Sequence, residues 1–156
     1  MKKNVNMIIA SKDSTLKNTY LYINSTEKSI IKMQQTHSTN IYTLPETYFN
    51  HTQTIQNTDG LITTSKSHIL AVKWADCLPI IIYHPKKILC VLHAGRKGSN
   101  KKILEIALNK LVQIAGTNEY FEIYMGPHIC ETCYEINAVK HTHFSLLKTN
   151  ITQLKK

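Results

Sequence analysis

The fold is decided by residues 78–92, LPIIIYHPKKILCVL, in which two apolar runs surround one short polar segment. The runs at 78–83 and 88–92 are nearly all apolar, which is typical of strands that are buried on both faces of a sheet. The segment between them, HPKK at 84–87, is short, polar and contains proline, as expected of a turn. The sequence therefore predicts a β-hairpin made of two central strands.

Shorter β-rich segments precede this hairpin. Each carries β-branched or aromatic residues, and the segment at 49–58 is polar and is predicted to be a loop. The predicted upstream strands are 7–10, 20–23, 30–34, 41–44, 61–63 and 69–74.

Helices and one further strand follow the hairpin. A helix is predicted to begin at Ser99 or Asn100 and to stop at Gly116, because serine and asparagine cap helix starts and glycine ends helices. A strand at 120–125 and a helix at 137–148 come next. Spacing of three and four residues gives the first helix one buried stripe, Leu104, Leu108, Leu111 and Ala115. The order of elements predicts an α+β fold, a mixed β-sheet with flanking helices.

The length and charge of the chain limit its class. Its 156 residues predict a single domain over 1–156. The net charge is +9, but Arg96 is the only arginine, whereas proteins that read nucleic acids usually rely on arginine. A generic basic surface is therefore favoured over a nucleic-acid interface, and attraction of an anionic small substrate is a further possibility.

Hydrophobic segments are too short for membrane insertion. The longest apolar run, 78–83, is far below the ~20 residues of a transmembrane helix. The N-terminus is basic but lacks the apolar region of a signal peptide. We expect a cytoplasmic protein without membrane partners.

Four cysteines in such a protein suggest thiols, a metal or catalysis rather than disulfides. Cys130 and Cys133 form a Cys-x-x-Cys motif that fits half of a zinc knuckle, a redox pair or, the favoured interpretation, incidental loop cysteines. The roles of these two residues and of Cys90 stay open.

A candidate site combines Cys77 with two histidines. A four-residue hairpin loop pairs position 78 with His93, and a five-residue loop pairs Cys77 with His93; either brings both side chains to the same end of the two strands. His37 follows an earlier strand. One cysteine and two histidines would form a three-ligand zinc site with an open fourth position, the catalytic pattern, although each residue alone is more often an ordinary core or surface residue.

Two neighbouring features refine this site. The string AGRKG at 94–98 is a basic, glycine-flanked turn entering a helix, which favours an anion. A cytidine-deaminase site is excluded because Gly95 stands where that pattern needs glutamate and Ile129 where it needs proline.

Five motifs in one order give the chain a family resemblance. They are QTH at 35–37, TDGLIT at 58–63, ADCLP at 75–79, HAGRKG at 93–98, and GPHI at 126–129 with CYEI at 133–136. Together they resemble the laccase-domain family, first described as multicopper polyphenol oxidases and now as purine nucleoside phosphorylases with adenosine deaminase activity. Some bacterial members are also called peptidoglycan-editing factors.

The resemblance implies a set of residue roles. His37, Cys77 and His93 fall on the family's metal ligands, and it implies zinc, a purine nucleoside such as adenosine, inosine or methylthioadenosine, and phosphate. Arg96 and Lys97 would bind phosphate, standing where the family usually has Trp and Arg. Asp76 is a candidate for orienting a ligand or a proton carrier, with a turn cap as the alternative.

The chain is shorter than typical members at both ends, which would leave an open sheet edge that a homo-oligomer could cover.

Two functions are alternatives to a zinc-dependent purine nucleoside phosphorylase. One is a degenerate remnant that binds zinc or a nucleoside with little turnover. The other is a hydrolase acting in peptidoglycan editing with Cys77 as nucleophile and His93 as base. Copper oxidase chemistry is less favoured because no motif places an axial methionine.

Overall fold

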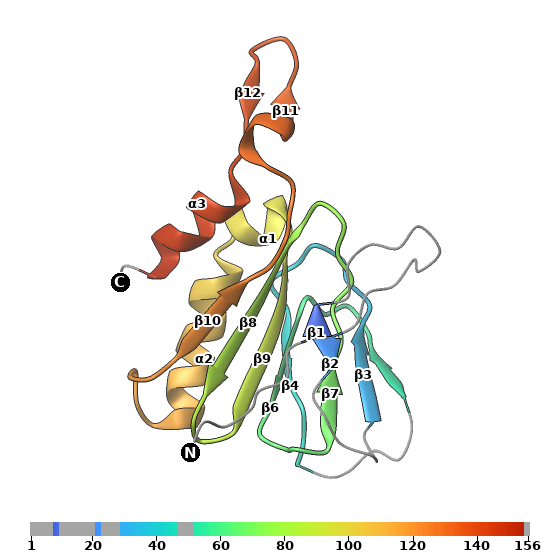
Figure 1. Cartoon of the computed structure of the whole chain (residues 1–156), viewed down its shortest axis with the longest axis vertical. Coiled ribbons are helices and arrows are strands. Elements are labelled where there is room, and N and C mark those ends of the chain that lie inside the picture. The colour runs from blue at the N-terminus through green and yellow to red at the C-terminus, as the bar shows by residue number, and fades with distance from the viewer. Residues whose placement is uncertain (1–7, 10–20, 23–28, 47–51, 155–156) are drawn as a thin grey trace.

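A five-stranded mixed sheet forms the centre of the molecule (Figure 1). The structure is a computed structural model that describes residues 8–9, 21–22, 29–46 and 52–154. The predicted strand ends at 7, 10, 20 and 23, and the start of the predicted loop at 49–51, lie outside these ranges. The strand order is β10-β8-β9-β6-β4, with β4 parallel to β6 and the other neighbours antiparallel. The strands of this five-stranded sheet are β4 (Ile41–Thr43), β6 (Gly60–Thr63), β8 (Leu78–His84), β9 (Ile88–Ala94) and β10 (Glu122–Met125).

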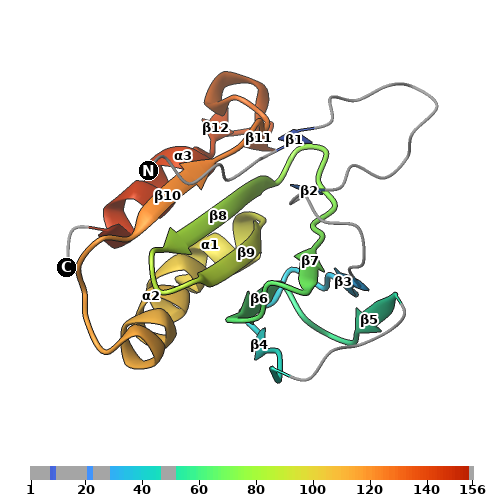
Figure 2. The ribbon, with the colours of Figure 1, turned by 60° about the horizontal axis from the view of Figure 1, so that its bottom comes forward.

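The predicted central hairpin is confirmed, and it is covered on both faces. One face of β8 and β9 packs with α2 (Ile103–Ala115), through Ile80, Leu92 and Leu104. The other face packs against a second sheet, through Ile81, Val91 and residues of β3 (Ser29–Met33). Figure 2 shows α2 on one side of these strands and the second sheet on the other. The apolar runs are therefore buried on both sides, as their composition predicts.

The second sheet has three parallel strands in the order β5-β3-β7, and two short strands pair upstream of it. The prediction of a continuous loop at 49–58 is wrong within the described residues, because Gln53–Ile55 pair with β3. These strands are β1 (Ile8–Ile9), β2 (Leu21–Tyr22), β3 (Ser29–Met33), β5 (Gln53–Ile55) and β7 (His68–Leu70).

Two helices, not one, follow β9. The predicted start at Ser99 or Asn100 is wrong: α1 (Arg96–Asn100) begins earlier, and α2 starts after Lys102, whose left-handed backbone (φ 63°) interrupts the helix. The predicted stop is confirmed, since Gly116 ends α2 with φ 68°, a conformation that glycine adopts without strain.

The C-terminal region departs most from prediction. Instead of a helix at 137–148, β11 (Glu135–Asn137) and β12 (Thr142–His143) form a protruding hairpin (Figure 1). The helix α3 (Leu146–Ile151) begins only where Ser145 Oγ accepts the backbone N–H of Lys148, at 3.2 Å. Two short 3₁₀ turns are η1 (Glu131–Cys133) and η2 (Thr152–Leu154).

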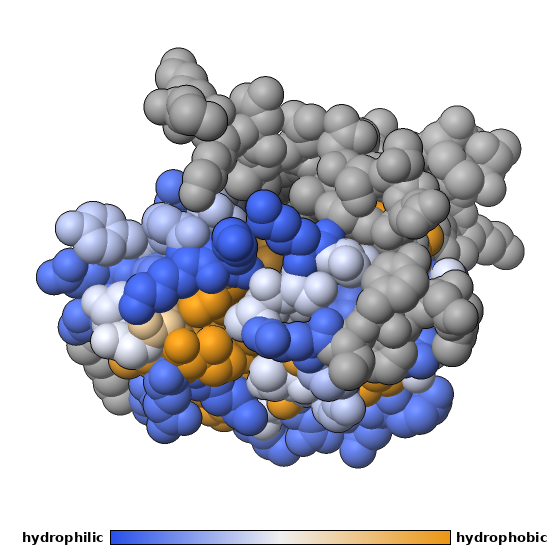
Figure 3. All heavy atoms as spheres, turned by 90° about the horizontal axis from the view of Figure 1, so that it is seen from below, coloured by the Kyte–Doolittle hydropathy of each residue, from blue (hydrophilic) through white to orange (hydrophobic). Residues whose placement is uncertain are grey.

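The end of the sheet at the β8–β9 turn shows a hydrophobic patch bordered by hydrophilic residues (Figure 3). Among the residues that the structure describes, no helix is both long and apolar enough to cross a membrane. The architecture agrees with the predicted α+β class, and the predicted catalytic side chains lie at the opposite end of the hairpin.

Candidate metal centre

The hairpin brings Cys77 and His93 to one end of the sheet, but neither predicted register is correct. The turn has three residues, 85–87, because His84 still pairs with Ile88. Pro79 therefore lies opposite His93, and Cys77 precedes the strand by one residue. Side chains alternate between the two faces of a strand, so residues two positions apart share a face. Cys77 is two positions from Pro79 and therefore approaches the face on which His93 lies. The prediction that both side chains reach the same end is confirmed.

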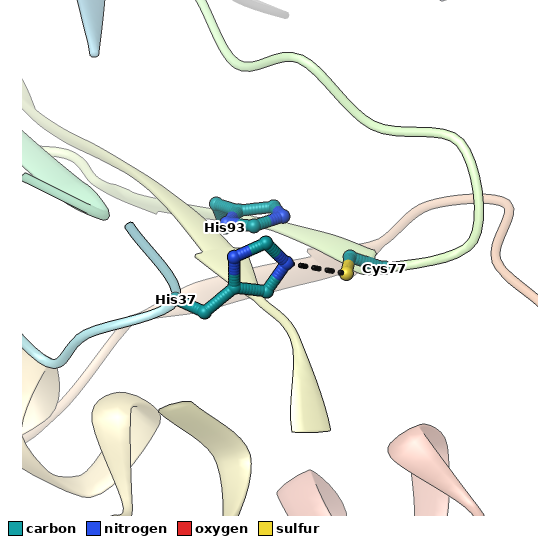
Figure 4. A group of neighbouring side chains, drawn as sticks. All are labelled: His37, Cys77 and His93. Carbon is teal, nitrogen blue, oxygen red and sulfur yellow. Dashed lines mark hydrogen bonds between the residues drawn. The ribbon is translucent and has the colours of Figure 1, made fainter. Parts of the chain in front are cut away.

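His37 completes the cluster from the connection between β3 and β4 (Figure 4). Its Nε2 lies 3.7 Å from Cys77 Sγ, and its ring meets the His93 ring edge-on, with centroids 4.8 Å apart. The three potential ligand atoms lie within 4.8 Å of one another. His37 has a left-handed backbone (φ 59°), which is rare outside glycine and indicates a position that its surroundings hold in place.

Asp59 holds that backbone. This fully buried carboxylate accepts the successive backbone N–H groups of Thr36, His37 and Ser38 at 3.1, 3.0 and 2.7 Å. It also accepts the Ser38 hydroxyl at 2.7 Å. Three consecutive N–H groups around one anion form a backbone nest. Asp59 therefore fixes the loop that carries one potential ligand.

Asp59 also orients a second potential ligand. Its Oδ1 lies 2.8 Å from His93 Nδ1, so Nε2 of this imidazole is left for a metal. Burial raises the pKa of the Asp59 carboxyl, but the hydrogen bonds from His93 and Ser38 outweigh it and hold that pKa well below its usual value. Burial lowers the pKa of His93, but interactions with Asp59 and Cys77 outweigh it and raise that pKa to about 9.

Sequence reasoning missed Asp59 and read it, with Gly60, as part of a turn. The available signal was an ionisable residue directly before an apolar strand, a position where a carboxylate is either in a turn or buried with partners. Asp76, the residue predicted to orient a ligand, is exposed, and its backbone carbonyl accepts the N–H of Ile129 at 2.9 Å. A role for Asp76 stays a prediction.

Gly95 leaves the space that the cluster needs. A Cβ at this position would lie 2.7 Å from His37 Cδ2 and 3.0 Å from Cys77 Sγ. Such distances are well inside van der Waals contact. Only a residue without a side chain therefore fits between these two potential ligands.

The cluster opens onto a cavity of about 210 Å³, lined by His37, Cys77, Arg96, Lys97 and Tyr134. The two basic residues come from the first turn of α1 and are exposed. Tyr134, which sequence reasoning did not single out, arrives because the segment after β10 runs beside 76–79, where Gly126 and Ile129 donate to backbone carbonyls. The predicted phosphate-binding pair thus borders the same cavity as two of the predicted metal ligands.

The donor set suits a transition metal. Ligands of a tetrahedral zinc ion lie roughly 3.5 Å apart at usual bond lengths of about 2.0–2.3 Å. The separation of 3.7 Å between Cys77 Sγ and His37 Nε2 already matches, and small side-chain rotations would bring His93 into range. Two imidazoles and one thiolate fit zinc or copper and leave one position toward the cavity.

The other cysteines lie outside the cluster. Cys90 is fully buried in the core, and burial raises the pKa of its thiol far above the usual value. The expectation that the chain lacks disulfides is wrong for Cys130 and Cys133, which are bonded across η1. Their Cα atoms are 5.3 Å apart because the 3₁₀ turn folds the motif back, and this separation is within the disulfide range.

Comparison with known proteins gives consistent matches. A family model described as multi-copper polyphenol oxidoreductase laccase matches residues 6–155. Purine nucleoside phosphorylase Cj1217c of Campylobacter jejuni is 41% identical over 85 residues, covering 51% of this chain and 36% of the relative. The purine nucleoside phosphorylase of Borreliella burgdorferi is 33% identical over 113 residues, covering 72% and 48%. Adenosine deaminase RL5, from an unknown prokaryotic organism, is 27% identical over 128 residues, covering 75% and 49%.

Solved structures show the same fold. The hypothetical protein YfiH of Bacillus licheniformis aligns with a TM-score of 0.67 at 22% identity, covering 80% of this chain and 58% of that one. YlmD of Geobacillus stearothermophilus aligns with a TM-score of 0.62 at 19% identity, covering 77% and 45%. The chain spans less than half the length of the three relatives described above.

Proposed function

The chain belongs to the multi-copper polyphenol oxidoreductase laccase family, and we propose that it is a zinc-dependent purine nucleoside phosphorylase. Its substrates would be inorganic phosphate with adenosine, inosine or methylthioadenosine, and adenosine deamination would be a second reaction of the same centre. Relatives named for both activities support this proposal. The observation that carries it is the His37–Cys77–His93 cluster, open to a cavity that Arg96 and Lys97 also line.

Zinc is favoured over copper by what surrounds the donors. Copper electron-transfer sites with two histidines and one cysteine add a weak axial ligand, usually methionine. Met33 and Met125, the methionines with described side chains, pack with the hydrophobic cores and do not line the cavity. A three-ligand centre with one open position is the pattern of catalytic zinc.

Phosphorolysis joins an oxygen of hydrogen phosphate to the anomeric carbon of the ribose, while the bond from that carbon to the purine breaks. The purine leaves with the electron pair of that bond and takes up the proton that the phosphate gives up. Arg96 and Lys97 would hold the phosphate by charge, and Asp59 would keep His37 and His93 in place. When bound, zinc supplies Lewis acidity and an activated water. A cavity of about 210 Å³ is smaller than usual ligand pockets, so part of a nucleoside would extend beyond it.

An assay of purine release tests the proposal. Zinc-loaded protein is incubated with inosine, adenosine or methylthioadenosine, with and without phosphate, next to the Cys77→Ser variant. We expect base release that needs both phosphate and zinc, and its loss in the variant. Release that persists after chelation of the metal would contradict the zinc-dependent reaction.

One observation favours a second candidate, a cysteine hydrolase acting in peptidoglycan editing. The Asp59 carboxylate is hydrogen-bonded to His93, and His93 interacts with Cys77. Cysteine hydrolases arrange a carboxylate, a base and a nucleophile in the same way. This reaction would need no metal, would survive chelation and would stop on alkylation of Cys77. A cytoplasmic location, a homo-oligomer and the absence of nucleic-acid or membrane partners stay predictions.

A further inference from the structure

The junction between α1 and α2 has helix ends that need partners from elsewhere in the chain. α1 ends at Asn100, and α2 begins at Ile103 after the left-handed Lys102. Lys102 makes no side-chain capping hydrogen bond. The first N–H groups of α2 lack partners within their own helix. At the end of α1, the Ser99 carbonyl accepts the N–H of Lys102 at 3.0 Å, and its second lone pair is left for another donor.

Gln153 of η2 binds both helix ends with one side chain. Its Oε1 accepts the backbone N–H groups of Leu104 and Glu105, both at 3.2 Å. Its Nε2 donates to the carbonyl of Ser99 at 3.0 Å and to that of Thr149 at 3.1 Å. The residue is 7% exposed, so an unpaired amide here would be costly. Gln153 therefore caps α2 and ties it to the end of α1.

A second amide strengthens this link. Asn150 Nδ2 donates to Ser99 Oγ and to the carbonyl of Leu146, both at 2.8 Å. Asn150 is fully buried and Ser99 is 1% exposed. The C-terminal segment, residues 146–154 of α3 and η2, thus binds both the side chain and the backbone carbonyl of Ser99.

The position of α1 determines where the cavity has its positive charge. Arg96 and Lys97, in its first turn, line the cavity beside His37. α1 also lies close to the loop that carries His37, since a Cβ on Gly98 would lie 2.9 Å from the carbonyl oxygen of Ser38. A small displacement of α1 would therefore move both basic groups relative to the cluster.

We propose that Gln153 is a positioning residue for the anion side of the cavity. It acts through α1 and touches neither the cluster nor the cavity. The inference rests on the proposed function only in taking phosphate as the anion. Residues of the C-terminal segment would thus set the affinity for phosphate while leaving the metal ligands in place.

The test uses Gln153→Glu, with Ser145→Ala as the control. Glutamate keeps the acceptor for Leu104 and Glu105 but loses the donor to Ser99, and it places a carboxylate oxygen against the Ser99 carbonyl. The control removes the side-chain cap of α3 and leaves in place the hydrogen bonds that Gln153 and Asn150 make to Ser99. We expect Gln153→Glu to raise the KM and Kd for inorganic phosphate by about tenfold, with kcat at saturating phosphate and zinc stoichiometry changed less than about twofold. Unchanged phosphate affinity, or an equal loss in Ser145→Ala, would overturn the proposal.

Hydrogen exchange makes the test independent of the proposed function. At the two ends of α1, the N–H groups of Ser99 and Lys101 donate to the carbonyls of Gly95 and Lys97, at 2.8 and 3.1 Å. We expect them to exchange at least about tenfold faster in Gln153→Glu than in wild type and Ser145→Ala. If wild type binds no phosphate, the proposed function fails, and equal exchange in all three proteins would then refute the role of Gln153.

Discussion

Replacing Gly95 with alanine should weaken metal binding strongly while leaving the fold intact. The added methyl group would lie 2.7 Å from His37 Cδ2 and 3.0 Å from Cys77 Sγ, where ordinary contacts are about 3.5–4.0 Å. The overlap is therefore roughly 1 Å, several times the ~0.2 Å tolerance of a metal–ligand distance. Two of the three ligands would have to move apart.

The backbone itself tolerates the change. Gly95 has φ −76° and ψ 172°, an extended conformation that alanine adopts without strain. His37 is exposed and can rotate outward, so the methyl group displaces the ligand rather than the core. We expect zinc affinity to fall by about 100-fold or more, and the free energy of unfolding of the metal-free protein to change by about 1 kcal/mol or less.

The assay is zinc competition against a chromophoric chelator, with thermal unfolding of the metal-free protein in parallel. Gly116→Ala is the control, because it strains a left-handed residue (φ 68°) and its Cβ would meet nothing within 4 Å. The control should lose about 1 kcal/mol of stability and keep its zinc. If Gly95→Ala binds zinc as tightly as wild type, the arrangement of ligands around Gly95 is refuted.

Three further changes test the surroundings of the cluster. Asp59→Asn should lower zinc affinity by about 10–100-fold, because the amide cannot accept all the bonds that hold His37 and His93; unchanged affinity in the same competition assay would contradict this role. Raising the pH should destabilise the metal-free protein by up to about 3 kcal/mol, since the pKa of His93 is raised from 6.5 to about 9 and the stabilisation present below pH 6.5 is lost as the pH passes 9. Urea unfolding at pH 6.5 and 9.5 measures this, and equal stability at both would count against the His93–Asp59 pair. Replacing Arg96 and Lys97 together by methionine should raise KM for phosphate by about tenfold or more, with zinc content unchanged; steady-state kinetics that show no change would remove these residues from phosphate binding.

The central part of the fold could be predicted because its signals are local. The apolar runs of β8 and β9 and the spacing of leucines in α2 are read directly from neighbouring residues. The register of the hairpin was not predictable, since it depends on the left-handed backbone of Lys87 (φ 67°), which closes the turn in three residues.

Long-range partners explain most of the rest. The start of α2 after the left-handed Lys102 has its cap about fifty residues further along the chain, where the Gln153 side chain accepts the first N–H groups of the helix. The C-terminal hairpin is exposed and carries no apolar alternation that would distinguish it from a helix. Burial of Asp59 depends on three N–H groups from a loop more than twenty residues earlier, which no local pattern reveals.

The convergence of one thiolate and two imidazoles on one metal is tested most directly by X-ray absorption at the zinc edge of the zinc-loaded protein. The structure predicts one zinc per chain with one sulfur and two imidazole nitrogens in its first shell, and loss of the sulfur signal in Cys77→Ser. A zinc environment without sulfur, or a protein that retains no zinc, would contradict it.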